Sequence, residues 1–507
     1  MELFTIGFVT ALSAQNLLYC FLGVFLGTFI GVLPGVGSLA AVALLLPVTF
    51  YLEPTTALVM LAGVYYGAEY GGSTASILLN LPGTPSSAVT CIDGYQLTRQ
   101  GRAGVALFVT TVASFLGGSV GILLLIFFAP AIVTFALAFG PAEYFAAMLF
   151  GLIGAATISQ GSPLKGLAMV AFGVLVGSIG TDSHSGVQRF TLGYLQLFEG
   201  VSLVVLAMGL FGVSEIIASI RGQQAGRFAQ KIRLREMLPG RADLRRSAFP
   251  AVRGTAVGSL LGALPGAGPS IAAFLSYALE KRVSREPERF GKGALEGVAS
   301  PEAANNAAVQ TAFIPTLSLG IPGSATMAIM LGALMIHGIT PGPQLMTEHP
   351  QLFWGLVASF WIGNLLLLVL NIPLIGIWVR LLTIPYRLLY PGIIVLICMG
   401  VYSLRSNPFD IWMVLLFGLI GYGMRLLRFE PAPLLIGFVL GPMIEDNFRR
   451  AMILARGDFL RLFERPIAGT LLALVILLLL WMLVSAVRAK RLAPAAPVLP
   501  GDSTSAR

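Results

Sequence analysis

A pattern of small residues followed by a proline occurs twice in this chain, in the same register. Pro34 and Pro265 lie 231 positions apart (265 − 34), and glycines flank both prolines at the same spacing. Glycines four residues apart on a helix let a neighbouring helix approach closely. The Leu-Pro-Gly-x-Gly that ends each copy should interrupt the helix, because proline lacks a backbone donor and glycine tolerates positive φ. The pattern therefore predicts an internal duplication in which each copy contains a broken helix. The paired residues are Gly23, Gly27, Gly31, Leu33, Pro34, Gly35 and Gly37, and Gly254, Gly258, Gly262, Leu264, Pro265, Gly266 and Gly268.

The composition places these broken helices in a membrane. Hydrophobic residues make up 56% of the chain and charged residues only 11%, whereas soluble proteins have about 25% charged residues. Apolar stretches of about 20 residues, the length that spans a bilayer, recur along the sequence. We therefore predict an all-α polytopic membrane protein with roughly 10 to 14 membrane elements, some of them re-entrant hairpins. The net charge of +9 comes from loops between apolar spans, which argues against a nucleic-acid partner.

Boundaries in apolar character and charge divide the chain into five parts. Residues 1–220 form the first predicted transmembrane repeat, and 248–445 form the second. The segment 221–247 between them is rich in arginine and is expected to be a cytoplasmic connector. Residues 446–487 are expected to hold a loop and the last transmembrane helix. The tail 488–507 has the composition of a disordered segment.

The charges of the loops predict that the two halves have inverted topology. In the first half, loop 50–56 has no Lys or Arg, whereas loop 98–103 carries two. The second half reverses this order, because loop 280–292 has five Lys or Arg and loop 339–350 has none. Basic loops tend to face the cytoplasm. Corresponding loops of the two halves should therefore lie on opposite sides of the membrane.

Four breaks, at Pro34, Pro82, Pro265 and Pro322, are followed by glycine and by Ser or Thr. A half-helix that starts there offers free N–H donors, the positive end of its dipole and a hydroxyl group. Four such starts converging on one cavity could bind a carboxylate without a buried Lys or Arg. The alternative is that the breaks only kink packed helices. The candidate substrate-binding residues are Pro34, Gly35, Gly37, Ser38, Asn80, Pro82, Gly83, Thr84, Ser86, Ser87, Pro265, Gly266, Gly268, Ser270, Pro322, Gly323, Ser324 and Thr326.

Polar residues also cluster in the spans that join each pair of breaks. Glu69 follows Pro34 by 35 positions (69 − 34) and Glu302 follows Pro265 by 37 (302 − 265), which suggests near-equivalent positions and paired roles. Ionisable residues inside a membrane usually face a cavity or a partner, so we expect coupling to sodium or protons here. Sodium is the candidate metal, without an assigned set of ligands, and no organic cofactor is expected. Interhelical hydrogen bonding is the alternative role. The candidate coupling residues are Glu69, Ser73, Thr74, Glu302, Asn305 and Asn306.

Two further patterns resemble enzyme sites. The segment 117–121 fits G-x-S-x-G but lies inside a continuous apolar helix, where helix packing is the better interpretation. Asp182, Ser183, His184 and Ser185 have the composition of a catalytic triad, but a polar cap or gating loop is favoured. We therefore predict that the chain is not an enzyme. An intramembrane enzyme acting on a lipid-soluble substrate and an anion channel remain the alternatives.

Seven motifs distributed over both halves carry a family resemblance. They are Gly31-Val-Leu-Pro-Gly-Val-Gly37, Gly67-Ala-Glu-Tyr-Gly-Gly-Ser-Thr74, Asn80-Leu-Pro-Gly-Thr-Pro85, Asp93-Gly-Tyr95, Gly262-Ala-Leu-Pro-Gly-Ala-Gly-Pro269, Glu302-Ala-Ala-Asn-Asn306 and Gly320-Ile-Pro-Gly323.

In order and spacing, over about residues 1 to 450, these motifs resemble the large permease subunit of the tripartite tricarboxylate transporters, the TctA-like family. The resemblance implies a secondary transporter in the bacterial inner membrane, driven by sodium or protons and importing citrate or another carboxylate. It also implies two partners, a small membrane subunit and a periplasmic solute-binding protein. An elevator-like motion of the broken hairpins is expected by analogy with related transporters. The identity of the carboxylate is left open, because the binding protein supplies much of the selectivity.

Overall fold

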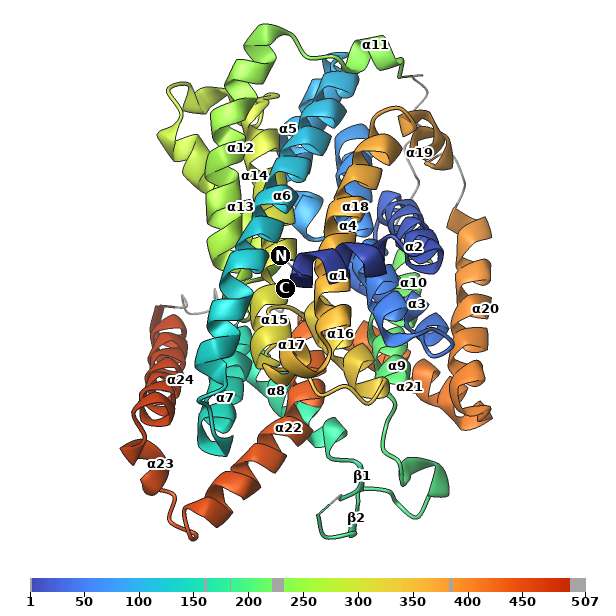
Figure 1. Ribbon diagram of the computed structural model, residues 1–507. Coiled ribbons are helices and arrows are strands. Elements are labelled where there is room, and N and C mark those ends of the chain that lie inside the picture. The colour runs from blue at the N-terminus through green and yellow to red at the C-terminus, as the bar shows by residue number, and fades with distance from the viewer. Residues whose placement is uncertain (1, 159–161, 183, 221–231, 383–385, 493–507) are drawn as a thin grey trace, which may run out of the picture.

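The protein is described here from a computed structural model that covers residues 2–158, 162–182, 184–220, 232–382 and 386–492. The described chain is predominantly helical, as predicted, and most of its helices run along one common direction (Figure 1). The described part of the chain has one short sheet, in which β1 (Gly180–Thr181) pairs antiparallel with β2 (Gln188–Arg189).

The first half of the chain contains the elements up to α10. Their bounds are α1 Glu2–Ala11, α2 Ala14–Val32, α3 Gly37–Thr49, α4 Pro54–Leu79, the 3₁₀ turn η1 Ser86–Ala88, α5 Thr90–Arg99, α6 Ala103–Ala136, α7 Pro141–Ile158, α8 Pro163–Gly177, η2 Leu195–Leu197, α9 Leu203–Ala207, the π-helical segment η3 Met208–Val213 and α10 Ser214–Ile220.

The second half and the C-terminal part follow. Their bounds are α11 Leu234–Met237, α12 Arg241–Gly262, α13 Gly268–Val283, η4 Pro287–Arg289, α14 Glu296–Thr311, α15 Phe313–Leu319, α16 Ala325–Ile336, α17 Gln344–Glu348, α18 Pro350–Asn371, α19 Ile375–Leu381, α20 Tyr386–Arg405, α21 Pro408–Leu426, α22 Ala432–Leu454, α23 Arg461–Glu464 and α24 Pro466–Leu492.

Some predicted domain boundaries fall inside helices, because α22 runs from Ala432 to Leu454 across the boundary between residues 445 and 446. Residues 221–231 of the expected connector lie outside the described residues, and α12 already begins at Arg241. The helix α24 continues to Leu492, and the rest of the expected tail again lies outside the described part. The division into two repeats, a connector and a tail stays a prediction.

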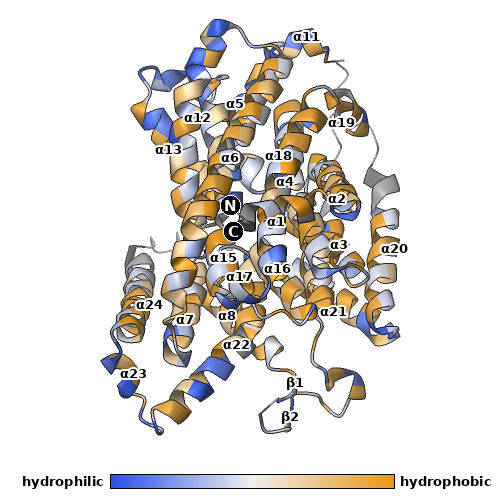
Figure 2. Cartoon of the chain, in the orientation of Figure 1, coloured by the Kyte–Doolittle hydropathy of each residue, from blue (hydrophilic) through white to orange (hydrophobic). Residues whose placement is uncertain are grey.

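The hydropathy of the helices matches a membrane protein. Among the described residues, 5 helices are long and apolar enough to cross a membrane, and six further apolar helices have 10–17 residues. Together these two sets fall within the predicted number of membrane elements. Figure 2 shows hydrophobic residues through the middle of the molecule and hydrophilic residues concentrated at its two ends. The all-α polytopic fold is therefore confirmed.

Glycine faces bring two pairs of helices into backbone contact. A Cβ atom added at Gly27 of α2 would lie 2.4 Å from the carbonyl oxygen of Val64 in α4. The counterpart of this glycine in the second half is Gly258 of α12, and a Cβ there would lie 2.1 Å from the carbonyl oxygen of Ala304 in α14. Only glycine permits such an approach, as predicted from the repeated pattern. Each half therefore contains one tightly packed pair, α2 with α4 and α12 with α14.

All four predicted breaks interrupt helices. The helix α2 ends at Val32 before Pro34, and α12 ends at Gly262 before Pro265. Gly35 and Gly266 occupy the same left-handed conformation, with φ of 87° and 86°, which explains the requirement for glycine. The two later breaks each follow a left-handed cap, Asn80 with φ 59° and Gly320 with φ 70°.

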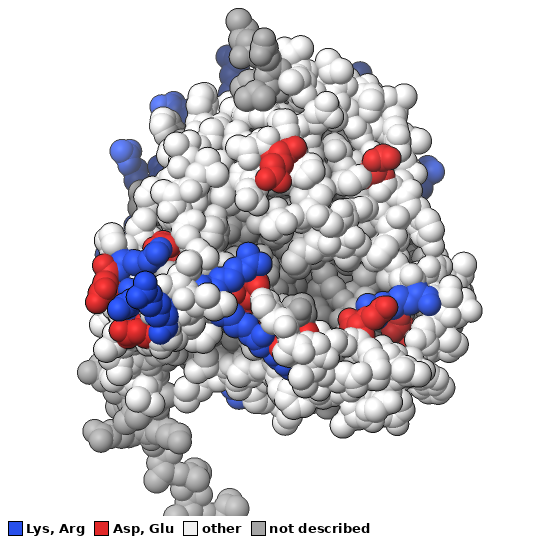
Figure 3. Space-filling view, turned by 60° about the horizontal axis from the view of Figure 1, so that its bottom comes forward, with Lys and Arg blue, Asp and Glu red and all other residues white. Residues whose placement is uncertain are grey.

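The basic loops of the two halves meet at one end of the molecule. Gln100, in the loop after α5, donates a hydrogen bond from Nε2 to the carbonyl oxygen of Lys292, at 2.8 Å. At the same end Arg102 forms an ion pair of 2.7 Å with Asp243 near the start of α12. The opposite end, which comes forward in Figure 3, carries mixed clusters of basic and acidic side chains. In one of these clusters Arg189 of the β-hairpin binds Glu445 of α22, at 2.9 Å.

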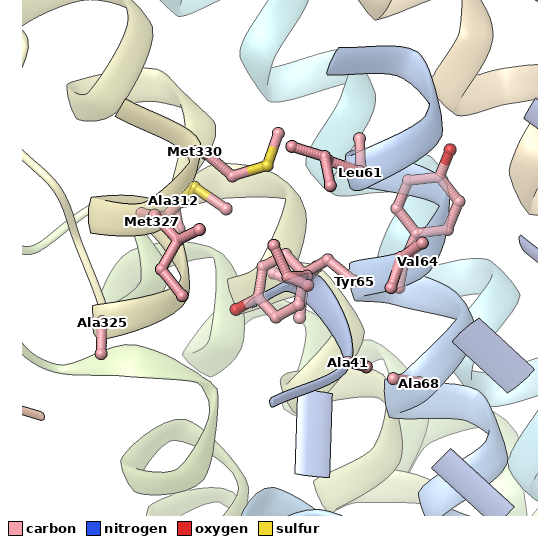
Figure 4. Close-up of a cluster of buried hydrophobic side chains, with 14 of the residues drawn as sticks. Ala41, Leu61, Val64, Tyr65, Ala68, Ala312, Ala325, Met327 and Met330 are labelled. Carbon is pink, nitrogen blue, oxygen red and sulfur yellow. The ribbon is translucent and has the colours of Figure 1, made fainter. Parts of the chain in front are cut away.

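Apolar side chains join the two halves near the breaks. Figure 4 shows Tyr65 pointing from α4 towards the beginning of α16, and its hydroxyl interacts with Ser324 at the start of that helix. Around this contact the labelled side chains of both halves pack together, and they are Ala41, Leu61, Val64, Ala68, Ala312, Ala325, Met327 and Met330.

Candidate functional site

Glu69 lies in the middle of α4 and is only 2% exposed. Its Oε1 accepts a hydrogen bond of 2.6 Å from Ser38, the first residue after Gly37 in α3. Its Oε2 accepts from Thr84, at 3.2 Å, and from Ser86. These three hydroxyls follow the breaks at Pro34 and Pro82, so the two broken segments of the first half converge on one carboxylate. We call Ser38, Thr84 and Ser86 the hydroxyl cradle.

Hydrogen bonds between α4 and α14 link the carboxylates of Glu69 and Glu302, and each helix donates to the carboxylate of the other. Asn305 of α14 donates from Nδ2 to Oε2 of Glu69, at 3.2 Å. In return Ser73 of α4 donates to Oε2 of Glu302, at 2.6 Å. Thr90, at the start of α5, donates to the other oxygen of Glu302. Four of the six predicted coupling residues, Glu69, Ser73, Glu302 and Asn305, therefore form one network across the two halves.

This network holds two acidic groups without a basic partner. Glu302 is 1% exposed, and within the described residues neither Glu69 nor Glu302 forms an ion pair with Lys, Arg or His. Burying a carboxylate is costly unless hydrogen bonds or a cation compensate the charge. One further acceptor lies beside Glu69, because the Oδ1 atom of buried Asn305 has no hydrogen-bond partner among the residues that the structure describes. The network therefore offers oxygen atoms, which are the ligands that hard cations prefer.

Backbone hydrogen bonds join the two breaks within each half. Gly35 and Gly37 donate to the carbonyl oxygens of Pro82 and Gly83, at 3.3 and 3.1 Å. In the second half Gly266 donates to the carbonyl oxygen of Gly323, at 3.0 Å. These bonds satisfy backbone groups that broken helices leave open. The two breaks of each half therefore lie in backbone contact, and the convergence of all four on one cavity stays a prediction.

The predicted hydroxyl groups of the second half are arranged differently. Ser324 caps α16 by accepting a hydrogen bond from the backbone of Met327, at 3.3 Å. Ser270 and Thr326 make no side-chain hydrogen bond within the part of the chain that the structure describes. Pro265 lies close to Gly151 of α7, and Pro322 is buried. The second pair of breaks thus supplies no hydroxyl to Glu69 or Glu302.

Four other candidate residues lie outside the network of the two carboxylates. Asn80 is exposed and acts through its backbone as the cap of α4. Ser87 bonds to Ser76 and to the backbone of Thr84, at 3.0 and 2.9 Å. Asn306 donates to the carbonyl oxygen of Glu302 within its own helix, at 3.1 Å. Thr74 is buried without a side-chain hydrogen bond among the described residues.

The expected equivalence of Glu69 and Glu302 is wrong. Gly31 packs against Ala68, and its counterpart Gly262 packs against Ala308, so the residue that corresponds to Glu69 is Val309. Glu302 lies seven positions earlier (309 − 302), about two helical turns away. Counting from the prolines hid this shift, because the loop before α14 is longer than the loop before α4.

Two residues that contribute to this region carried no predicted role. Thr90 follows Ser86 by one helical turn, and this spacing could have indicated that the two hydroxyls lie on the same side of the chain. Asp93 of α5 accepts hydrogen bonds at Oδ1 from the backbone N–H groups of Gly291, Gly293 and Ala294, at 2.8 to 2.9 Å. Its Oδ2 accepts from the hydroxyl of Tyr277, at 2.9 Å. Asp93 therefore fastens a loop of the second half to the first half.

The two enzyme-like patterns have structural roles in the described chain. A Cβ at Gly117 of α6 would lie 2.1 Å from the carbonyl oxygen of Ala303, which confirms the interpretation of 117–121 as a packing face.

In the second pattern, Ser185 donates to Asp182 at 2.7 Å, and Arg189 and Arg449 form ion pairs with Asp182. The hydrogen bond from Ser185, that from the backbone of His184 and the arginines lower the pKa of Asp182. Asp182 and His184 border a pocket of about 460 Å³ between the hairpin and α22. Residue 183 lies outside the described residues.

Comparisons with known proteins identify the family of the chain. Residues 17–436 match the model of the tripartite tricarboxylate transporter TctA family. An uncharacterized 52.8 kDa protein in the TAR-I ttuC' 3'region of Agrobacterium vitis is 50% identical over 487 residues, which cover 96% of this chain and 97% of that protein. An uncharacterized protein in the TAR-II ttuC' 3'region of the same organism is 53% identical over 234 residues, covering 46% of this chain and 97% of that protein. No solved structure matches the chain. The chain belongs to the tripartite tricarboxylate transporter TctA family.

Proposed function

We propose that this chain is the membrane permease subunit of a binding-protein-dependent secondary transporter that imports tricarboxylates or related carboxylates. The observation that carries the proposal is the hydroxyl cradle. Ser38, Thr84 and Ser86 come from the ends of two broken segments and together hold a carboxylate group, that of Glu69. A cavity built from such donors can bind a substrate carboxylate without a buried basic residue.

The energy source in this proposal is a sodium or proton gradient. Glu69 and Glu302 are buried, acidic and without a basic partner in the described chain. A cation that neutralises one of them would remove the cost of its buried charge. Ser73 and Asn305 connect the two carboxylates, so a cation at one affects the other.

The proposed orientation places the basic end of the molecule in the cytoplasm of a bacterium and the chain in the inner membrane. Loops 98–103 and 280–292 occur at different positions in the two halves, yet they contact each other at this end. This contact supports an inverted repeat, because only opposite topologies bring those loops to one side. The opposite face (Figure 3) is then periplasmic and accessible to a solute-binding protein. A small membrane subunit completes the proposed system.

The proposed motion is of the elevator type. The backbone contacts at Gly27 and Gly258 make α2 with α4 and α12 with α14 closely packed units, which suits movement as a rigid body. The carboxylate network lies between these units, so it would travel with them.

Uptake into proteoliposomes tests the proposal. The chain is reconstituted with its small subunit and binding protein, and radiolabelled citrate, succinate and acetate are offered with and without inward sodium and proton gradients. The proposal predicts saturable uptake that requires both a gradient and the binding protein. Linear flux without a gradient would indicate a channel instead. Chemical conversion of a substrate without transport would indicate an enzyme.

A further inference from the structure

The hydroxyl cradle is filled by a carboxylate of the chain itself. Ser38 donates to one oxygen of Glu69, and Thr84 and Ser86 donate to the other. A hydroxyl has only one proton to donate. A substrate carboxylate and Glu69 therefore cannot both accept the full set of hydrogen bonds at the same time.

Displacing Glu69 from the cradle leaves its charge uncompensated. The side chain is 2% exposed, so water cannot replace the lost donors without a rearrangement. Within the described chain Glu69 forms no ion pair with Lys, Arg or His that could compensate the charge. A buried and unpaired carboxylate is strongly unfavourable. Release of Glu69 is therefore favourable only when a positive ion binds to it.

A ligand atom for such an ion is already next to Glu69. Asn305 is 1% exposed, and its side-chain nitrogen contacts Oε2 of Glu69 at 3.2 Å. Its Oδ1 atom has no hydrogen-bond partner in the described chain. An unpaired buried carbonyl oxygen beside a carboxylate is a pair of oxygen ligands suited to a hard cation.

We propose that Glu69 is an internal competitor for the substrate carboxylate and that its displacement creates the cation site at Glu69 and Asn305. This inference rests on the proposed function of the hydroxyl cradle and explains how substrate and ion are coupled there. Binding of the substrate raises the affinity for the cation, and thermodynamic linkage requires the cation to raise the affinity for the substrate by the same factor. Without substrate, the cradle holds Glu69 and the ion binds weakly.

Removing the cradle tests this mechanism without a substrate or a partner subunit. The double variant Ser38→Ala, Ser86→Ala is prepared as the full chain in lipid nanodiscs, with Ser359→Ala as matched control. Ser359 is also a buried hydroxyl, but it donates to the carbonyl oxygen of Leu356 in its own helix, at 2.6 Å. Binding of radiolabelled sodium is measured at constant ionic strength, and uptake of protons is measured with a dye in weakly buffered solution.

The double variant should bind sodium, or take up a proton, with an affinity about 5- to 150-fold higher than the wild type, the usual range of coupling between two sites. Adding Glu69→Gln to the double variant should abolish the gain, and Ser359→Ala should behave as the wild type. Unchanged affinity for both ions, or a gain that persists with Glu69→Gln, would overturn the proposal. If the double variant does not fold, the single variants Ser38→Ala and Thr84→Val must each give a smaller gain in the same direction.

The ion-binding experiment and the uptake assay can fail independently of each other. A chain that takes up none of the three carboxylates but gains cation affinity when the cradle is removed refutes the assigned transport and supports the competition. If the chain transports a carboxylate but the double variant shows no gain in cation affinity, the proposed function stands and the competition by Glu69 is refuted.

Discussion

Replacing Gly27 by alanine tests whether close helix packing stabilises the fold. The new Cβ would lie 2.4 Å from the oxygen and 2.7 Å from the Cα of Val64, whereas ordinary contacts are 3.4–4 Å. The obstacle is backbone, so α2 and α4 must separate, and overpacking costs about 3 kcal/mol at the upper end of its range. Alanine recovers about 1 kcal/mol through its higher helix propensity. The free energy of unfolding should therefore fall by about 2 kcal/mol.

The matched control is Gly423→Ala in α21, where an added Cβ meets nothing within 4 Å. This variant should be more stable than the wild type by up to about 1 kcal/mol. Unfolding is followed by tryptophan fluorescence in mixed micelles of a mild detergent and increasing dodecyl sulfate. A stabilising role of the close packing at Gly27 is refuted if Gly27→Ala is as stable as the wild type, or if both substitutions change the free energy of unfolding equally.

Three further predictions concern the first pair of breaks, the loop contact and the hairpin. Gly83→Leu should abolish uptake while the chain still inserts into the membrane, because a Cβ there would lie 2.1 Å from a backbone oxygen of α2; full uptake would remove this break from the site. Asp93→Ala should cost at least about 2 kcal/mol and raise hydrogen exchange at Gly291, Gly293 and Ala294, whose N–H groups lose their acceptor; unchanged exchange would contradict this. The pKa of Asp182 is lowered first by its bond from Ser185, so the folded state gains stability above the ordinary aspartate pKa of about 3.9, and this gain is lost as the pH falls below it. Proteolysis of the hairpin should therefore increase in acid, and Asp182→Asn should show the same sensitivity at neutral pH.

Features encoded by neighbouring residues could be predicted from the sequence. Proline lacks a backbone donor and glycine tolerates positive φ, and these local properties of Pro34, Gly35 and their counterparts made the four breaks predictable. The repetition of Gly27 as Gly258 indicated two tight helix pairs, because glycine on a helix face lets a neighbouring helix approach closely. The pattern does not show which helix packs against each glycine face, because the packing of α2 against α4 depends on the tertiary fold.

Features that depend on contacts between residues far apart in the sequence could not be predicted in the same way. The hydroxyls of Ser38 and Ser86 were expected to face a ligand, but their acceptor is Glu69, more than 15 residues away from either. The alignment of Glu69 with Glu302 failed because a loop of different length precedes each helix. Asp93 binds backbone N–H groups of a loop that lies 198 to 201 residues later in the sequence. No local pattern indicates such a partner.

The most direct measurement is an experimental structure of the complete transporter with a transported carboxylate and its coupling ion bound. Competition between Glu69 and the substrate predicts a carboxylate group of the substrate against Ser38, Thr84 and Ser86, with the side chain of Glu69 turned away and a cation beside Glu69 and Asn305. A substrate bound elsewhere, with Glu69 still accepting hydrogen bonds from all three hydroxyls, would contradict it.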